Sequence, residues 1–134
     1  MVFAGPEENP CLRVLMATAL KHAGLPPRDP FAPGSLFSLG RPGAIDALFR
    51  QAGFSHVAVT RLEAPFRLPS AGAYVAFARA AAAPVHAVLA GLDPAARERA
   101  WTEMEAELGR FAGPEGWEGP NTLLLAAGRR SQSS

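Results

Sequence analysis

Several features that would assign this chain to a familiar class of protein are scarce or missing. Cys11 is the only cysteine, so no disulfide can form within the chain, and the composition fits the reducing cytoplasm. The net charge is only +1, which gives no electrostatic reason to expect nucleic acid or an anionic membrane as a partner. No G-x-G sequence occurs, so the chain has no glycine-rich loop of the kind that seats a nucleotide after a parallel strand.

Side chains that bind metals or carry out nucleophilic chemistry are few and scattered. The three histidines are far apart and show no H-x-x-x-H spacing, so we expect no metal site. Cys11 follows a predicted helix start, but no pattern places a histidine beside it as a general base. Glu103 and Glu107 are four residues apart on a predicted helix, where they more simply form a solvated side than an acid–base pair. We therefore assign no catalytic residue.

Long hydrophobic runs are also scarce. The longest, residues 71–91, is largely alanine. It carries Arg79 near its middle and Pro84 shortly after Arg79. A charge at the bilayer centre costs at least ~2.5 kcal/mol, so we expect a lid or core helix here and no membrane span. The N-terminus has no basic region followed by a long apolar run, so we expect no targeting segment.

The most informative stretch that is present is residues 43–68, GAIDALFRQAGFSHVAVTRLEAPFRL. Its first part predicts a short helix with one apolar face, formed by Ile45, Leu48, Phe49 and Ala52. Gly53 lies where a helix ends in a left-handed residue. Residues 57–62 then alternate along the chain as a half-buried strand does, which predicts a strand up to the break at Pro65.

Capping residues mark the other helices. Asn9 before Pro10 predicts a helix start, and Gly24 predicts the end of that helix. Ser70 predicts the start of the next helix, which we expect Pro84 to interrupt.

The last third of the chain predicts a helix and a strand joined by a loop. A helix begins at Asp93-Pro94, ends at Gly109 or Gly113 and has apolar residues at helical spacing, namely Ala100, Trp101, Met104 and Leu108. Residues 113–120, GPEGWEGP, predict a turn-rich loop. Residues 122–128, TLLLAAG, predict a second strand, and we expect the polar tail 131–134 to fray.

The passage from helix through Gly53-Phe54 into a strand resembles the back half of class I S-adenosylmethionine-dependent methyltransferases. The resemblance extends along the chain in order. Residues 2–4 are similar to the end of the fifth strand, 10–39 to the variable lid, 43–62 to the last sheet helix and the sixth strand, 70–111 to a helical insertion, and 122–128 to the seventh strand. The family's seventh strand lies antiparallel beside its sixth.

The resemblance implies an α+β fold with a small antiparallel sheet of two or three strands covered by helices. We expect residues 1–130 to form a single domain. The front half of such an enzyme, with its glycine-rich loop of the type E-x-G-x-G-x-G, is missing from this sequence. S-adenosylmethionine is implied for the full-length family, and we expect this chain alone to bind no cofactor.

The resemblance also places substrate-binding residues in the lid and insertion, where aromatic side chains wall a pocket. The candidates are Phe31, Phe37, Phe66, Arg67, Tyr74, Phe77 and His86. Arg67 is the candidate for an anionic group of the substrate, with a simple surface charge as the alternative. For His86, the alternative to a general base is a histidine at the rim of an apolar face.

Three hypotheses for the function follow. The first is the substrate-lid half of a small-molecule methyltransferase, inactive on its own. The second is a stand-alone ligand-binding or protein-interaction module derived from that fold. The third, with the least support, is an independent enzyme that uses His86 or the glutamates of the last helix. The methyl acceptor is not specified, because the lid is the family's most variable part.

We also expect the chain to associate. A sheet of two or three strands with an open apolar edge is poorly stable alone, and every ~100 Å² of apolar surface left wet forgoes roughly 2.5 kcal/mol. A homodimer or higher symmetric oligomer would bury that surface through the sheet edge or the alanine-rich segment 71–89. A separate cofactor-binding half is the rival partner.

Overall fold

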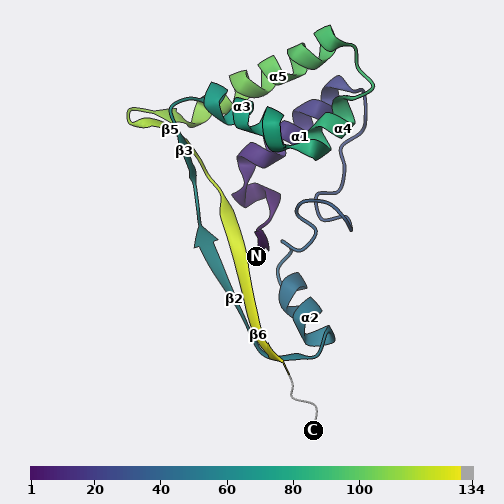
Figure 1. The fold of residues 1–134 in the computed structure, drawn as a ribbon, viewed down its shortest axis with the longest axis vertical. Helices are drawn as coiled ribbons and strands as arrows, with labels where there is room; N and C mark the ends of the chain where they lie inside the picture. Colours follow the sequence, from purple (N-terminus) through teal and green to yellow (C-terminus); the bar gives the residue numbers. More distant parts are fainter. Residues whose placement is uncertain (131–134) are drawn as a thin grey trace. The chain divides into compact units, whose positions relative to one another are not determined.

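The computed structural model describes residues 1–130 and has an α+β fold with antiparallel sheets, which confirms the predicted class. The helices are α1 (Pro10–His22), α2 (Ala44–Gln51), α3 (Ala71–Ala81), α4 (Ala83–Leu89) and α5 (Pro94–Leu108), with short 3₁₀ turns at Pro6–Glu8 and Gly109–Phe111. The strands are β1 (Val2–Phe3), β2 (Phe54–Glu63), β3 (Phe66–Leu68), β4 (Ala112–Gly113), β5 (Gly116–Gly119) and β6 (Thr122–Arg130) (Figure 1). The predicted tail 131–134 lies outside the described residues.

The chain folds as two compact units, and each is built from separate stretches of sequence. Unit 1 contains residues 1–9, 29–64 and the C-terminal segment from Asn121. Unit 2 contains residues 10–28 and 65–120. Unit 1 therefore holds β1, β2, β6 and α2, whereas unit 2 holds the remaining helices and the three short strands.

Unit 1 is a three-stranded antiparallel sheet in the order β1-β6-β2. The predicted strands 57–62 and 122–128 both form, and they pair with Ala58 opposite Ala127 and Glu63 opposite Thr122. Because residues directly opposite each other share a face, Leu124, Ala126 and Val59 lie on one face and Leu125, Thr60 and Leu62 on the other. Figure 1 shows β2 and β6 side by side with α2 along one side of them.

Helix α2 packs on the first of these faces. Ile45 is buried with Ala4 and Leu124, and Phe49 packs against this small cluster. The predicted apolar face is only partly right, because Leu48 is 46% exposed and Ala52 is also exposed. The predicted left-handed glycine is confirmed: Gly53 has φ +93° and its N–H donates to the Arg50 carbonyl at 3.0 Å.

Asn9 has a different role from the helix cap that the sequence predicts. Its side chain is fully buried, and Nδ2 donates to the carbonyls of Ala4, Gly5 and Thr122 at 3.1–3.2 Å. Its Oδ1 accepts from the Thr122 N–H at 2.9 Å. The amide therefore joins the turn after β1 to the start of β6, where it satisfies backbone groups that are buried.

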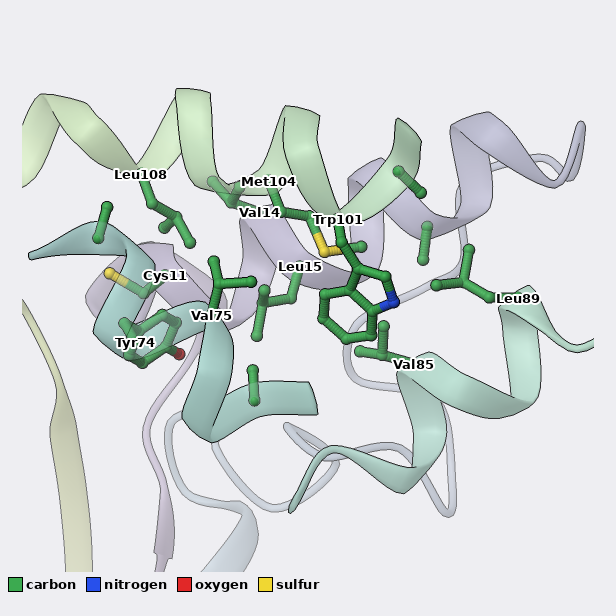
Figure 2. Packing of buried hydrophobic residues seen from close by; sticks show 14 of the residues in the cluster. Cys11, Val14, Leu15, Tyr74, Val75, Val85, Leu89, Trp101, Met104 and Leu108 are labelled. Carbon is green, nitrogen blue, oxygen red and sulfur yellow. The ribbon is translucent and has the colours of Figure 1, made fainter. Parts of the chain in front are cut away.

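Unit 2 holds the larger hydrophobic core. Helices α1, α3, α4 and α5 contribute its buried side chains, and in Figure 2 Trp101, Met104 and Leu108 point from α5 towards Leu15 on α1 and Val75 on α3. The buried positions of α5 are Ala100, Trp101, Met104 and Leu108, as its helical spacing predicts.

The caps of the unit 2 helices agree with the sequence. The Ser70 side chain accepts from the Ala73 N–H at 3.2 Å, and the Asp93 side chain accepts from the Ala96 N–H at 2.8 Å. Gly24 has φ +68°, and the Leu25 N–H after it reaches back to the Leu20 carbonyl at 2.9 Å. This closes α1 in a Schellman arrangement.

The region predicted as a turn-rich loop is instead part of a second sheet. Strands β4 and β5 form a hairpin around Pro114-Glu115, and β3 pairs with β5 in the order β3-β5-β4. Trp117 lies in β5 opposite Leu68 and is fully buried. A side chain would not fit at Gly119, because a Cβ there would lie 2.5 Å from the Trp117 ring and 2.8 Å from the Cys11 sulfur.

The alanine-rich segment forms two helices with a sharp break. Helices α3 and α4 are bent by 83° at Ala82, two residues before Pro84. Ala71, Tyr74, Val75 and Ala78 of α3 are buried, so one face of this segment is already used within unit 2. Among residues 1–130 no single helix is long and apolar enough to cross a membrane, and α3 and α4 meet those requirements only as a bent pair.

Candidate functional site

The predicted substrate-binding residues are divided between the two units. Phe31 and Phe37 belong to unit 1, where the Arg41 guanidinium lies 5.0 Å from the Phe31 ring centre and Phe37 packs edge-on against Phe3. The other candidates, Phe66, Arg67, Tyr74, Phe77 and His86, belong to unit 2. The structure brings Phe66, Tyr74 and Phe77 together and does not bring His86 to them.

These three aromatic residues are part of a larger set in unit 2, which we call the aromatic cluster: Phe66, Tyr74, Phe77, Phe111 and Trp117. Tyr74 stacks on Trp117 with ring centres 4.9 Å apart. Phe66 packs against Tyr74 at 5.5 Å and against Phe77 at 6.2 Å. Because Trp117 and Tyr74 are buried and Phe77 is 55% exposed, the cluster runs from the core of unit 2 to its surface.

A groove of about 770 Å³ lies beside the aromatic cluster. It is lined by Arg67, Leu68, Pro69, Phe111, Gly113, Pro114, Glu115, Gly116, Trp117 and Glu118. These residues come from β3, the β4–β5 hairpin and the 3₁₀ turn before it, all within unit 2. The volume is within the range of small-molecule sites, which combine apolar walls with a few polar groups.

The lining of the groove carries one basic side chain, Arg67, and two acidic ones, Glu115 and Glu118. The Arg67 Nε lies 3.7 Å from the Glu118 carboxylate, directly across the β3–β5 pair. Glu115 lies at the tip of the hairpin, and Arg110 stacks its guanidinium 4.8 Å from the Phe111 ring centre. Arg67 and Glu118 are both exposed, so water weakens the attraction between them.

Two buried groups of unit 2, the Cys11 thiol and the Tyr74 hydroxyl, have raised pKa values. Burial raises the pKa of the Cys11 thiol to about 12, partly offset by Arg110. Burial also raises the pKa of the Tyr74 hydroxyl, with the nearby Cys11 adding to the effect. Both groups are therefore protonated and neutral near pH 7, and the thiol is a packing group rather than a nucleophile.

His86 is a helix-linking residue. Its Nε2 donates to the Arg79 carbonyl at 2.6 Å, which joins α4 to the end of α3 across the bend. Its ring also lies 5.3 Å from Trp101, whose face is covered by the Arg79 guanidinium. Arg79 also forms an ion pair with Glu98 through two of its nitrogens. The contacts of His86 and Arg79 therefore hold α3, α4 and α5 together.

The acidic side of α5 also pairs within unit 2. The Glu103 carboxylate accepts from Lys21 at 2.6 Å and contacts the His22 Nε2 at 2.9 Å. These two bonds to α1 hold the pKa of Glu103 below its usual range, that from Lys21 more than that from His22. In the described part of the chain, no group of three or more His, Cys, Asp and Glu side chains is placed to hold a metal ion.

The sequence missed the part of the groove made by the hairpin. Phe111 and residues 113–118 are predicted from the sequence to lie in a helix end and a loop, although the Gly and Pro residues of G-P-E-G also mark a tight turn of the kind that can join two short strands. The residues that line the groove include no cysteine, serine, threonine or histidine.

No model of a known protein family and no curated protein matches the chain.

Proposed function

We propose that this chain is the substrate-covering, C-terminal half of a small-molecule methyltransferase of the class I fold, and that it is inactive on its own. The observation that carries the proposal is the arrangement of the unit 1 sheet. A helix ends at Gly53 and leads into β2, and the last strand of the chain, β6, lies antiparallel beside it over most of its length. This is the order and direction of elements expected at the end of such an enzyme.

Unit 2 supports the part of the proposal that concerns the substrate. Its two stretches, 10–28 and 65–120, contain most of the lid-like segment 10–39 and all of the insertion-like segment 70–111, and they fold into one compact body, whereas residues 29–39 belong to unit 1. That body carries the groove and the aromatic cluster. In methyl transfer the sulfonium of the cofactor is already activated, so the protein mainly aligns the acceptor and excludes water. A lid can therefore matter without a catalytic acid or base.

The residues of this chain do not fit S-adenosylmethionine. The cofactor needs a glycine-rich loop after a strand, and the turn after β1 is instead Gly5-Pro6 followed by the 3₁₀ turn Pro6–Glu8. The carbonyls at that turn are already bonded to the Asn9 amide. The cofactor site of the proposed enzyme would belong to the other half.

Two measurements test the proposal. Calorimetric titration of the purified chain with S-adenosylmethionine should give no saturable binding at micromolar concentrations, and one-site binding would overturn the claim that the cofactor site belongs to the other half. Reading the DNA upstream of Met1 should reveal an in-frame strand, glycine-rich loop and helix. A neighbouring frame of unrelated sequence would count against the methyltransferase origin.

The groove favours a second candidate, a stand-alone module that binds small molecules. Under this alternative the chain alone binds an aromatic anion in the groove. Arg67→Gln should then weaken binding about tenfold, the effect of losing one charge-assisted hydrogen bond. Arg99→Gln, an exposed position on α5 outside the groove, makes the same change of charge and should leave binding unchanged.

The state of Cys11 bears on the cellular location of the protein. A single buried, unreactive Cys11 fits a reducing compartment, and we propose that the protein is cytoplasmic.

A further inference from the structure

Strand β2 is a long strand at the edge of its sheet. In the order β1-β6-β2, β6 lies along one side of β2 and no other described strand lies along the other. The side chains of residues 58–63 are exposed. Such an edge presents backbone N–H and C=O groups in a row and pairs readily with another strand.

The face of this sheet opposite α2 is mainly apolar and partly exposed. It is formed by Ala58, Thr60 and Leu62 of β2 and by Leu123, Leu125 and Ala127 of β6. Leu62 is 38% exposed and Leu125 is 43% exposed. A free edge beside an open apolar face marks an interaction surface.

We propose that β2 pairs antiparallel with β2 of a second copy of the chain, around a twofold axis at Leu62. A twofold axis perpendicular to the sheet keeps each face on its own side, so only registers centred on a residue are possible. The regular part of the edge begins at Ala58, because the register of β2 on β6 shifts between Ser55 and Ala58 and His56 has a left-handed φ of 51°. The centre therefore lies within residues 58–63, and a centre at Leu62 pairs residues 61–63 of one copy with residues 63–61 of the other.

Charge selects the register. With the centre at Leu62, Arg61 of one copy lies directly opposite Glu63 of the other, and symmetry makes this pair twice. A centre at Arg61 would oppose two like charges, and a centre at Thr60 would place both charged residues opposite valines. Opposite charges directly across two strands stabilise a sheet, and like charges destabilise it.

Arg61 can make this contact without losing its present partner. Its guanidinium already pairs with Glu8 of the same unit. A guanidinium has five N–H donors, so one side can remain on Glu8 while another meets the partner's Glu63.

The same register continues the apolar face across the two copies. Leu62 lies opposite Leu123 in its own sheet, so the centre would align Leu123, Leu62, the partner's Leu62 and the partner's Leu123 in one row. This row covers part of the surface that unit 1 leaves exposed. The self-complementary charges and this leucine row are what favour a second copy over an unrelated strand.

A charge exchange tests the pairing. Arg61→Glu makes both positions acidic, and Glu63→Arg makes both basic, so each single variant should dimerise at least about tenfold more weakly than the native chain. An equimolar mixture of the two variants restores both opposite pairs and should form a heterodimer as readily as the native chain forms its homodimer. Glu63→Arg leaves the Arg61–Glu8 pair in place, and circular dichroism of each variant checks the fold.

A cysteine pair tests the register. Cys11 is buried and its thiol pKa is raised to about 12, so an added cysteine can be oxidised selectively. Leu62→Cys should form a disulfide between copies under mild oxidation, giving twice the 14.1 kDa chain mass. Thr60→Cys, on the same face two residues away, is the matched control and should crosslink far more slowly.

Three results would overturn the proposal. One is a particle of 14.1 kDa in light scattering at every concentration up to the highest tested. Another is a dimer whose affinity in both charge variants equals that of the native chain. The third is faster crosslinking through Thr60→Cys than through Leu62→Cys. These outcomes do not depend on the proposed enzymatic role, since none involves the groove or S-adenosylmethionine.

Discussion

The two units of this chain contrast in how much apolar surface they bury for themselves. In unit 2 four helices and a small sheet close around a continuous core that includes Trp101, Met104 and Trp117. In unit 1 the corresponding cluster is Ala4, Ile45 and Leu124, and large apolar side chains such as Leu48, Leu62 and Leu125 stay exposed. Unit 2 buries a continuous apolar core of its own, whereas unit 1 buries a small cluster and leaves large apolar side chains exposed to solvent.

The contrast extends to the kind of bond that holds each unit. Unit 2 is held by burial, with helix caps and ion pairs at its surface. Unit 1 is held chiefly by the β2–β6 ladder and by Asn9, whose buried amide satisfies four backbone groups. Backbone hydrogen bonds add less net free energy per group than apolar burial. The stability of unit 1 should therefore depend more on binding a partner, and the stability of unit 2 should depend more on the packing of its own core.

The largest expected effect is from Trp117→Ala, which should destabilise unit 2 by about 3–5 kcal/mol because a buried indole is lost. The indole stacks on Tyr74, and its N–H donates to the Leu108 carbonyl at 2.8 Å. Urea unfolding followed by circular dichroism measures the change. Leu48→Ala, an exposed position in unit 1, should change stability by no more than about 0.5 kcal/mol. Equal losses of stability in the two variants would contradict the proposed difference in buried core between the two units.

A smaller effect, of about 1–3 kcal/mol, is expected from Asn9→Ala. The substitution leaves the Thr122 N–H and three carbonyls without the amide. Hydrogen exchange at the Ala4 and Thr122 amides should speed up while exchange in α5 stays slow. Asn9→Asp keeps an acceptor for Thr122 but faces the carbonyls with a charge, so near neutral pH it should destabilise unit 1 at least as much. Uniform acceleration in both units would mean that they unfold together.

The smallest effect concerns pH and the bond between α1 and α5. The pKa of Glu103 is lowered in the folded state by hydrogen bonds from Lys21 and then His22. A lowered carboxyl pKa contributes stability above the unfolded pKa, and this contribution is lost as the pH falls through the lowered value. Glu103→Gln should remove that part of the acid dependence from thermal unfolding curves. Glu105→Gln on the same helix is the control and should retain it.

Local signals in the sequence predicted much of the fold correctly. Ser70, Asp93 and Gly53 each act where a cap was predicted, because capping depends on the residue and its immediate neighbours. The strands at 57–62 and 122–128 formed for a similar reason, since alternation is a local pattern. Leu48 shows the limit of such patterns: helical spacing marks a possible apolar face, but only a partner decides whether it is buried.

Long-range contacts were the part that the sequence did not reveal. Asn9 bonds to Thr122, 113 residues away, and no local rule distinguishes that role from a cap. The second sheet was missed because strands of two to four residues carry little periodicity. Among the candidate site residues, Phe66, Tyr74 and Phe77 meet in space, whereas His86 is used in joining α3 to α4. The groove required the pairing of β3 with β5, which only the fold reveals.

The place of β6 in its sheet has a consequence for the order in which the protein can be built. Strand β6 is the central strand of unit 1, yet it leaves the ribosome after every other strand that the structure describes. Until residues 122–130 emerge, β1 and β2 have no strand between them, and the Asn9 side chain has no Thr122 to bond. All four helices of unit 2 are synthesised earlier. During translation the helices of unit 2 can therefore become compact before β6 is available to join β1 and β2 in one sheet.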